Sequence, residues 1–205
     1  MASARPYQEL EWNIIAPGPS LKSWKVGDSV NPFKPRGPVI AVNNACLSGL
    51  PFDFLCAVDS PGGFKHIHEY FDLKQRNNIV VICRSRQAEA WLNLGYRVWP
   101  HQAREQDLVN RCWPVGSRPP EGIRYTSYSI TTALLRAAGA GATLINFYGV
   151  DMAGDRYSYG PDTRKRAPKN WASRWKSEIP VFENAVNALE NAGVKIIRHK
   201  PGAIN

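Results

Sequence analysis

Hydrophobic and polar positions follow two patterns along the chain. Short apolar runs alternate with longer stretches in which apolar residues recur at helical spacing. This alternation is typical of βαβ units, in which helices cover a largely parallel sheet. The run at residues 78–83 is apolar throughout, as expected for a strand buried on both faces. Seven runs are predicted strands, at residues 12–16, 38–43, 54–58, 78–83, 96–99, 143–148 and 194–198. The pattern predicts a three-layer, Rossmann-like α/β domain whose mainly parallel sheet has about six or seven strands.

Helical spacing predicts three helices, at residues 87–94, 129–138 and 179–192. Residues 100–125 and 152–178 show neither pattern. Long irregular segments of this kind often contain functional residues. Glycines follow the second predicted helix and precede a strand, whereas a dinucleotide fingerprint requires the opposite order. We therefore expect one α/β domain over residues 1–205, with an irregular loop at residues 152–178.

Length and composition narrow the class of protein. A chain of 205 residues suits one domain, and its 43% hydrophobic residues exclude a mainly disordered chain. No apolar run approaches the ~20 residues of a membrane-spanning helix, and the N-terminus lacks the apolar core of a signal peptide. We expect a cytoplasmic protein, in the host cytoplasm if a phage encodes it. The four cysteines have no metal-ligand spacing, so no metal is expected.

Charge is distributed unevenly along the chain. There are 26 Lys and Arg residues against 17 Asp and Glu residues, a net charge of +9. Residues 1–60 carry five of each sign, so the whole excess lies beyond residue 60. It is densest at residues 164–176, which fall in the irregular loop and contain six basic side chains and no acidic one. Such an excess favours anionic partners, and the alternative is a solubilising basic face.

Two tryptophans, Trp171 and Trp175, are interleaved with these cations. Lys and Arg neutralise phosphates while an aromatic ring stacks on a base, so the segment predicts binding of DNA or another polyanion. The alternative is that the two rings, four residues apart, anchor the loop on the core. The residues expected to contact the polyanion are Arg164, Lys165, Arg166, Lys169, Trp171, Arg174, Trp175 and Lys176.

Small or polar residues follow four of the predicted strands. Gly18 and Ser20 come after the first strand, and Asn43 ends the second. Asp59 follows the third and Asp151 the sixth. Parallel α/β sheets bind ligands at the carboxyl ends of their strands, and a glycine there lets the backbone approach a phosphate. The joint placement predicts one shared nucleotide site, although each residue alone is common in turns.

These residues belong to four short stretches: I-I-A-P-G-P-S-L, A-V-N-N, S-I-T-T-A-L-L-R-A-A-G and F-Y-G-V-D-M. Over most of the chain the set resembles bacterial sialyltransferases of the lipooligosaccharide type, their phage-encoded relatives and the archaeal hydroxymethylpterin pyrophosphokinase-like proteins. The resemblance implies a metal-independent glycosyltransferase with a nucleotide-sugar donor. It places the donor nucleotide on Gly18, Pro19, Ser20, Asn43, Ser129 and, at the phosphate, Tyr159.

Two positions depart from the sialyltransferase pattern. Pro17 stands where the family has an asparagine, and residues 174–176 stand where the family has its base histidine. His199 follows the last predicted strand, which is a different element. A transferase needs a base for the acceptor hydroxyl, and the carboxylate candidates are Asp59 and Asp151.

The leading prediction is a nucleotide-sugar-dependent glycosyltransferase that acts on an anionic acceptor, such as a hydroxymethylated base in phage DNA. Two alternatives stay open. One is an ATP-dependent diphosphotransferase like the pyrophosphokinases, and the other is a non-catalytic nucleic-acid-binding protein.

Overall fold

The computed structural model describes residues 10–101, 128–152 and 171–201. They form one parallel seven-stranded sheet in the order β5-β4-β3-β2-β1-β6-β7. The strands are β1 (Glu11–Ile15), β2 (Val39–Val42), β3 (Phe54–Cys56), β4 (Val80–Arg84), β5 (Arg97–His101), β6 (Leu144–Tyr148) and β7 (Lys195–Arg198). Each lies within two residues of a predicted run, so the predicted α/β fold class is confirmed.

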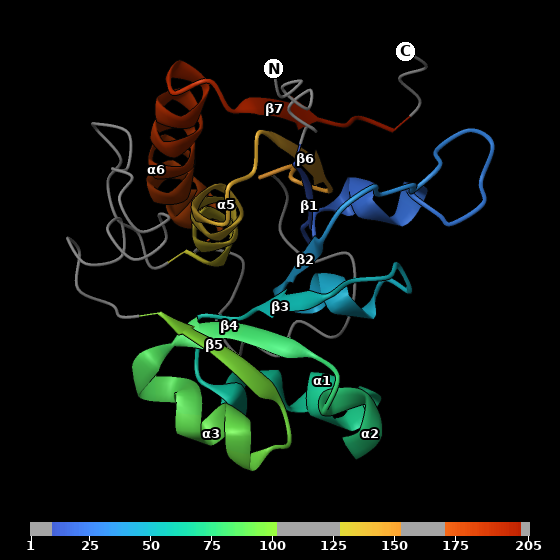
Figure 1. Cartoon of the computed structure of the whole chain (residues 1–205), viewed down its shortest axis with the longest axis vertical. Helices are drawn as coiled ribbons and strands as arrows, with labels where there is room; N and C mark the ends of the chain where they lie inside the picture. The colour runs from blue at the N-terminus through green and yellow to red at the C-terminus, as the bar shows by residue number, and fades with distance from the viewer. Residues whose placement is uncertain (1–9, 102–127, 153–170, 202–205) are drawn as a thin grey trace, which may run out of the picture.

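Helices cover both faces of the sheet and complete three layers (Figure 1). The helices α5 (Ser129–Gly139) and α6 (Trp171–Asn191) lie on one face. On the other face, at the β3–β5 end, lie α1 (Lys65–Tyr70), α2 (Leu73–Arg76) and α3 (Ala88–Asn93). Short 3-10 helices include η1 (Pro19–Ser23), η2 (Asn43–Leu47), η3 (Pro61–Phe64) and η4 (Ser85–Gln87). Among the described residues, no helix has the length and apolar character needed to cross a membrane.

Alternation along the strands divides the hydrophobic core in two. In β1, Trp12 and Ile14 face α5 and α6, while Ile15 faces the opposite layer. Ile14 and Ile15 are both fully buried, and each contributes about 2 kcal/mol of burial free energy. The sheet is therefore buried on both faces, as the continuous apolar runs predict.

The last helix differs from its prediction. It begins at Trp171, so residues 171–178 are helical and do not belong to an irregular loop. A proline usually marks a helix boundary, because its ring removes one backbone hydrogen bond. Here Pro180 lies inside a 21-residue helix, and the residues before it continue the helix toward the N-terminus. The basic loop expected at 152–178 is thus shorter at its C-terminal end.

The strand order reverses between β1 and β6. From β1 the chain builds β2 to β5 on one side, and β6 and β7 then add to the other side of β1. In open parallel sheets such a reversal leaves room between the loops that follow the two strands, and ligands bind there. The carboxyl ends of β1 and β6 are therefore the first place to look for a functional site.

Candidate functional site

Backbone and carboxylate contacts fasten the loops after β1 and β6 to each other. The amide of Ala16 donates to the Tyr148 carbonyl at 2.9 Å, and the Gly18 amide donates to the Gly149 carbonyl at 2.9 Å. Further along the same two loops, the Ser20 amide donates to Asp151 Oδ2 at 2.7 Å. We call this set of contacts the clasp. It gives the carboxylate of Asp151 a structural role at the start of η1.

Gly18 is required by the closeness of the two loops. A Cβ atom there would clash with the Gly149 carbonyl oxygen and with the Asp151 carboxylate. Gly149 itself has a φ of +69°, and a Cβ atom on it would clash with the Ala16 carbonyl. A positive φ is strained for residues with a side chain. The G-P-S turn predicted from the sequence therefore has a specific physical reason to contain glycine.

Asn43 and Ser129 meet beside the end of β2. Ser129 Oγ, in the first turn of α5, donates to Asn43 Oδ1 at 3.2 Å, and both residues are buried. Asn43 has a φ of +50°, which is uncommon outside glycine and tolerated best by Asn and Asp. Its Nδ2 group has no acceptor among the described residues. The structure thus brings together two residues that lie far apart in the sequence.

Asp59 lies apart from the clasp. It is exposed after β3, three positions from β6 in the sheet order. With neighbouring strands ~4.8 Å apart, the ends of β3 and β6 are about 14 Å from each other. Asp59 and Asp151 therefore do not form a close carboxylate pair, although they share one edge of the sheet.

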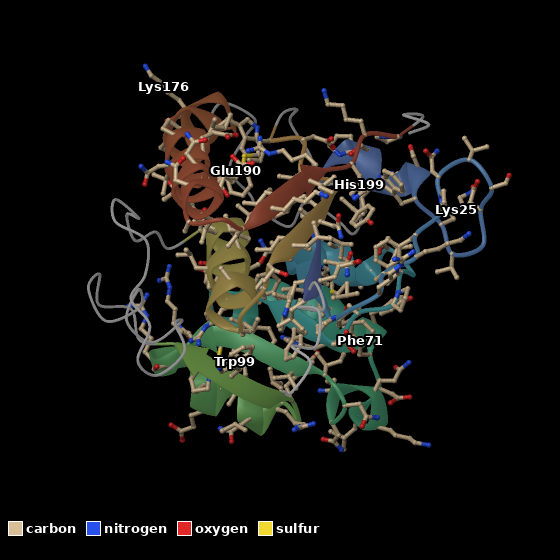
Figure 2. All side chains as sticks on the ribbon, turned by 45° about the horizontal axis from the view of Figure 1, so that its top comes forward. Lys25, Phe71, Trp99, Lys176, Glu190 and His199 are labelled. Atoms are coloured by element: carbon tan, nitrogen blue, oxygen red, sulfur yellow. The ribbon has the colours of Figure 1, made fainter. Side chains whose placement is uncertain are left out.

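The residues expected to contact a polyanion are described only in part. Tyr159, Arg164, Lys165, Arg166 and Lys169 lie outside the described residues. For Trp171 and Arg174 only the helical backbone of α6 is described. Nearby on the same helix, Trp175 is half-buried, while Lys176 is exposed and points away from the protein (Figure 2).

Sequence reasoning missed one histidine at this edge. His66, on α1, lies 2.8 Å from Asn44 Oδ1 through its Nε2 atom, and Asn44 is the neighbour of Asn43. Burial lowers the pKa of His66 below its ordinary value of 6.5, with Glu69 opposing the shift. The adjacent asparagines in A-V-N-N were a signal for Asn43, but nothing local to His66 indicates this contact.

A second missed feature is a line of polar groups across β1, β6 and β7. His199 Nε2 lies 2.9 Å from Asn146 Oδ1, and Asn146 Nδ2 donates to Asn13 Oδ1 at 3.3 Å. Both asparagines are buried. The imidazole of His199 stacks on the Tyr148 ring with centroids 4.5 Å apart and planes 3° apart. We call this line the polar ladder, and it adjoins the clasp because His199 stacks on Tyr148, whose carbonyl takes part in the clasp.

Burial disfavours the charged forms of the two rings beside the clasp. Burial, with a smaller contribution from the charge of Glu11, raises the pKa of Tyr148 to about 12. Burial lowers the pKa of His199, against the opposing charge of Glu11. Within the described ranges, no cluster of His, Cys, Asp or Glu has the arrangement of a metal site.

Comparison with known proteins adds a fold likeness. No protein-family model matches the chain, and its sequence matches no curated protein. Among solved structures it is similar to the sialyltransferase CstII from Campylobacter jejuni in complex with a substrate analogue, CMP-3FNeuAc. That match has 17% identity and a TM-score of 0.50, over 92% of this chain and 80% of that one.

Two further structures resemble the chain less closely. A structure of sialyltransferase CST-II in complex with trisaccharide acceptor and CMP has 17% identity and a TM-score of 0.48, over 91% of this chain and 80% of that one. The MAf glycosyltransferase from Magnetospirillum magneticum AMB-1 has 17% identity and a TM-score of 0.46, over 78% of this chain. The chain spans about a quarter of that protein, 25%. At 17% identity the likeness to CstII establishes a shared fold alone, and no comparison supports the expected link with pyrophosphokinases.

Proposed function

We propose that the protein is a nucleotide-sugar-dependent glycosyltransferase whose donor nucleotide binds at the carboxyl ends of β1, β2 and β6. The observation that carries the proposal is that the clasp, where the strand order reverses, and the Asn43–Ser129 pair, at the end of the neighbouring strand β2, lie at the carboxyl ends of adjacent strands. The fold likeness to CstII supports it, because that protein was solved with a CMP-sugar analogue.

Each residue has a chemical task in this proposal. Gly18 and Pro19 present backbone to the nucleotide, and the missing side chain of Gly18 is what allows the loops after β1 and β6 to come this close. The Nδ2 group of Asn43 donates to a base or ribose oxygen, while Ser129 holds the other end of that amide. Ser20 contributes its hydroxyl, since its amide is already bonded to Asp151. Tyr159 is proposed to contact the donor phosphate.

The acceptor hydroxyl needs a base, and the two carboxylates differ in availability. Asp151 accepts the Ser20 amide, so its position is set by the clasp. Asp59 is exposed, and among the described residues no hydrogen bond or ion pair restrains its carboxylate. We therefore assign Asp59 as the general base and Asp151 as the residue that positions the donor loop.

A panel of nucleotides tests the donor site directly. Isothermal titration with CMP, UDP, GDP, ADP and ATP should show binding of a nucleotide that is the leaving group of a sugar donor. Ser129→Ala should weaken that binding about tenfold by releasing the Asn43 amide. The control Ser85→Ala removes an exposed hydroxyl two strand positions from β2 and should leave affinity unchanged. Failure of every nucleotide to bind would favour the non-catalytic protein, and ATP-dependent AMP release would favour the diphosphotransferase.

The acceptor is proposed to be anionic, and DNA is the specific candidate. This rests on the basic character of residues 164–176. Three to four phosphate contacts predict that log affinity falls against log salt with a slope of about −3. Replacing Arg164, Lys165 and Arg166 by Ala should weaken binding of duplex DNA and leave nucleotide affinity nearly unchanged. If the same triple variant abolishes nucleotide binding instead, these cations act on the donor phosphate and the DNA acceptor is wrong.

A further inference from the structure

A loop projects from the edge of the protein beside the clasp. Residues 25–32 follow η1 and extend away from the sheet, and Lys25 marks the position of the loop in Figure 2 (compare Figure 1). Its side chains include Val26 and Val30, which are 65% and 62% exposed. We call residues 25–32 the valine loop. Because these two apolar side chains remain in water, they contribute little burial free energy to the fold itself.

The valine loop is closed by backbone hydrogen bonds. The amide of Lys25 donates to the Asn31 carbonyl at 3.3 Å, and the Phe33 amide donates back to the Lys25 carbonyl at 3.0 Å. At the tip, Asp28 Oδ1 accepts the amides of Val30 and Asn31 at 2.7 and 3.3 Å. The loop therefore presents its valines in a fixed conformation, which reduces the entropy lost when a surface binds them.

Aromatic side chains anchor the two ends of the valine loop. Trp24 and Phe33 flank it, and both are buried with ring centroids 5.0 Å from that of Tyr148. Tyr148 ends β6 next to the clasp. The conformation of the valine loop is therefore fixed by the packing of its two flanking residues against the end of β6.

The surroundings of the valines are cationic. Residues 20–37 contain four basic side chains against one acidic one, a local charge of +3. The four cations, all exposed, are Lys22, Lys25, Lys34 and Arg36. The acidic residue is Asp28, whose carboxylate turns inward to accept the two backbone amides. Those bonds lower the pKa of Asp28, so it stays in the turn as an ion.

We propose that the valine loop docks the protein on an anionic lipid bilayer. Apolar side chains at a tip enter the boundary between headgroups and acyl chains, while the surrounding lysines stay with the anionic headgroups. Cations beside an anionic membrane surface each add to this attraction. A nucleic-acid groove would draw on the same cations but would leave the two valines without an apolar environment. The occupant that uses both features is the lipid surface.

Docking in this way orients the proposed donor site. The residues that flank the valine loop, Trp24 and Phe33, pack on Tyr148 of the clasp, so docking through this loop would hold the clasp near the bilayer. An acceptor held at the membrane would then lie near the clasp. The docking surface itself does not depend on the proposed glycosyltransferase activity, and it can be tested without any donor.

Vesicle sedimentation with the full chain tests the proposal. Vesicles of phosphatidylcholine mixed with phosphatidylglycerol should sediment the protein at low ionic strength, and pure phosphatidylcholine should retain far less. The double variant Val26→Ser, Val30→Ser should lower the partition coefficient about tenfold, because two exposed apolar side chains no longer leave water. Lys25→Gln should lower it about fivefold on anionic vesicles alone.

A matched control separates docking from general hydrophobicity. Leu92 on α3 is 52% exposed at the other end of the sheet, and Leu92→Ser should leave vesicle binding unchanged. The valine variants should keep the melting temperature of the parent, and Val30→Thr provides a variant of preserved shape. The proposal is overturned if the parent does not sediment, if the valine variants bind as the parent does, or if Leu92→Ser loses as much. Equal weakening of duplex DNA and vesicle binding by the valine variants would also overturn it.

Discussion

Rings pack at both ends of the sheet, but the two ends differ in the polar groups that lie inside the sheet. At one end β3, β4 and β5 pack against α1 and α3, and we call this the aromatic end. The fully buried Trp91 lies 5.3 Å from the rings of His68 and Tyr96 and 6.0 Å from that of Phe64. The interior there is filled by large rings whose contacts do not depend on any single polar bond.

The end formed by β1, β6 and β7 contains polar groups in its interior, and we call it the clasped end. The polar ladder crosses its three strands, with Asn13 and Asn146 buried in the sheet. The loops after β1 and β6 approach so closely that Gly18 has no room for a side chain. Buried polar groups are stable only while they are hydrogen bonded, so this end depends on geometry.

The difference indicates that stability and the proposed nucleotide binding depend on different ends of the sheet. Packing of large apolar groups supplies most of the free energy of folding, and the aromatic end is arranged for it. In the proposed function, close backbone approach and fixed amides recognise the nucleotide, and they lie at the clasped end. Variants at the two ends should therefore separate stability from nucleotide binding.

The largest expected effect is on stability at the aromatic end. Trp91→Ala should lower the free energy of unfolding by about 4 kcal/mol, because it leaves a large cavity in a well-packed core. Urea denaturation measures this loss, and Leu92→Ala, an exposed neighbour on the same helix, should stay within about 0.5 kcal/mol of the parent. The protein that remains folded should bind nucleotide with unchanged affinity. A parallel loss of affinity would show that the two ends are not separate.

Next in size is Gly18→Ala at the clasp. The added methyl group must push the loops after β1 and β6 apart, which should lower the free energy of unfolding by about 2 kcal/mol. Nucleotide binding should be lost in the folded fraction. The matched control is Gly63→Ala, where a Cβ atom meets nothing within 4 Å and φ is not positive. If both alanines behave alike, the close approach at Gly18 is not what sets the site.

A smaller and more selective effect is expected at Asp151. Asp151→Asn keeps an oxygen that accepts the Ser20 amide, whereas Asp151→Ala removes it. The alanine variant should lose about 1 kcal/mol of stability and most of its nucleotide affinity. The asparagine variant should keep both, together with transferase activity. An asparagine variant that binds nucleotide but is inactive would make Asp151 the base in place of Asp59.

Periodicity was enough to predict the sheet. Every strand overlaps a short run that contains β-branched, aromatic or other apolar residues, so even the short β7 was predicted. The small helices were not predicted, since α2 has four residues and depends on a capping box between Asp72 and Gln75. The start of α6 was placed too late because the prediction followed apolar spacing, which begins at residue 179, whereas the helix already begins at Trp171.

The candidate site residues were predicted from the positions after strand ends and, for Ser129, from the resemblance to the sialyltransferases. Gly18 and Asp151 were expected at one edge, and the structure joins them through Ser20. The contacts of His66 and His199 depend on how distant elements cross, and no local pattern encodes that. The same limit applies to Asp59, which follows a strand as predicted but lies about 14 Å along the edge from β6.

The smallest effect expected is a pH dependence from the polar ladder. Burial lowers the pKa of His199 in the folded protein below its ordinary value of 6.5, so the unfolded chain takes up the proton more readily. The stability that the neutral ring contributes is therefore complete above pH 6.5 and is lost as the pH falls below it. The contribution should be less than about 1 kcal/mol, since the ring is partly exposed and solvent screens its charge.

His199→Gln tests this, because a glutamine amide can still donate to Asn146 Oδ1 without titrating. Urea denaturation of parent and variant between neutral and mildly acidic pH should show a smaller loss for the variant. His68 is the matched comparison at the aromatic end, since burial lowers its pKa in the same direction while its ring contacts Trp91 and Tyr96. His68→Gln should reduce the acid sensitivity too, but it should also lower stability at neutral pH by removing a ring from the packed core. If His199→Gln is the variant that loses stability at neutral pH, the stacking on Tyr148 matters more than the polar ladder, and the clasped end depends on packing as the aromatic end does.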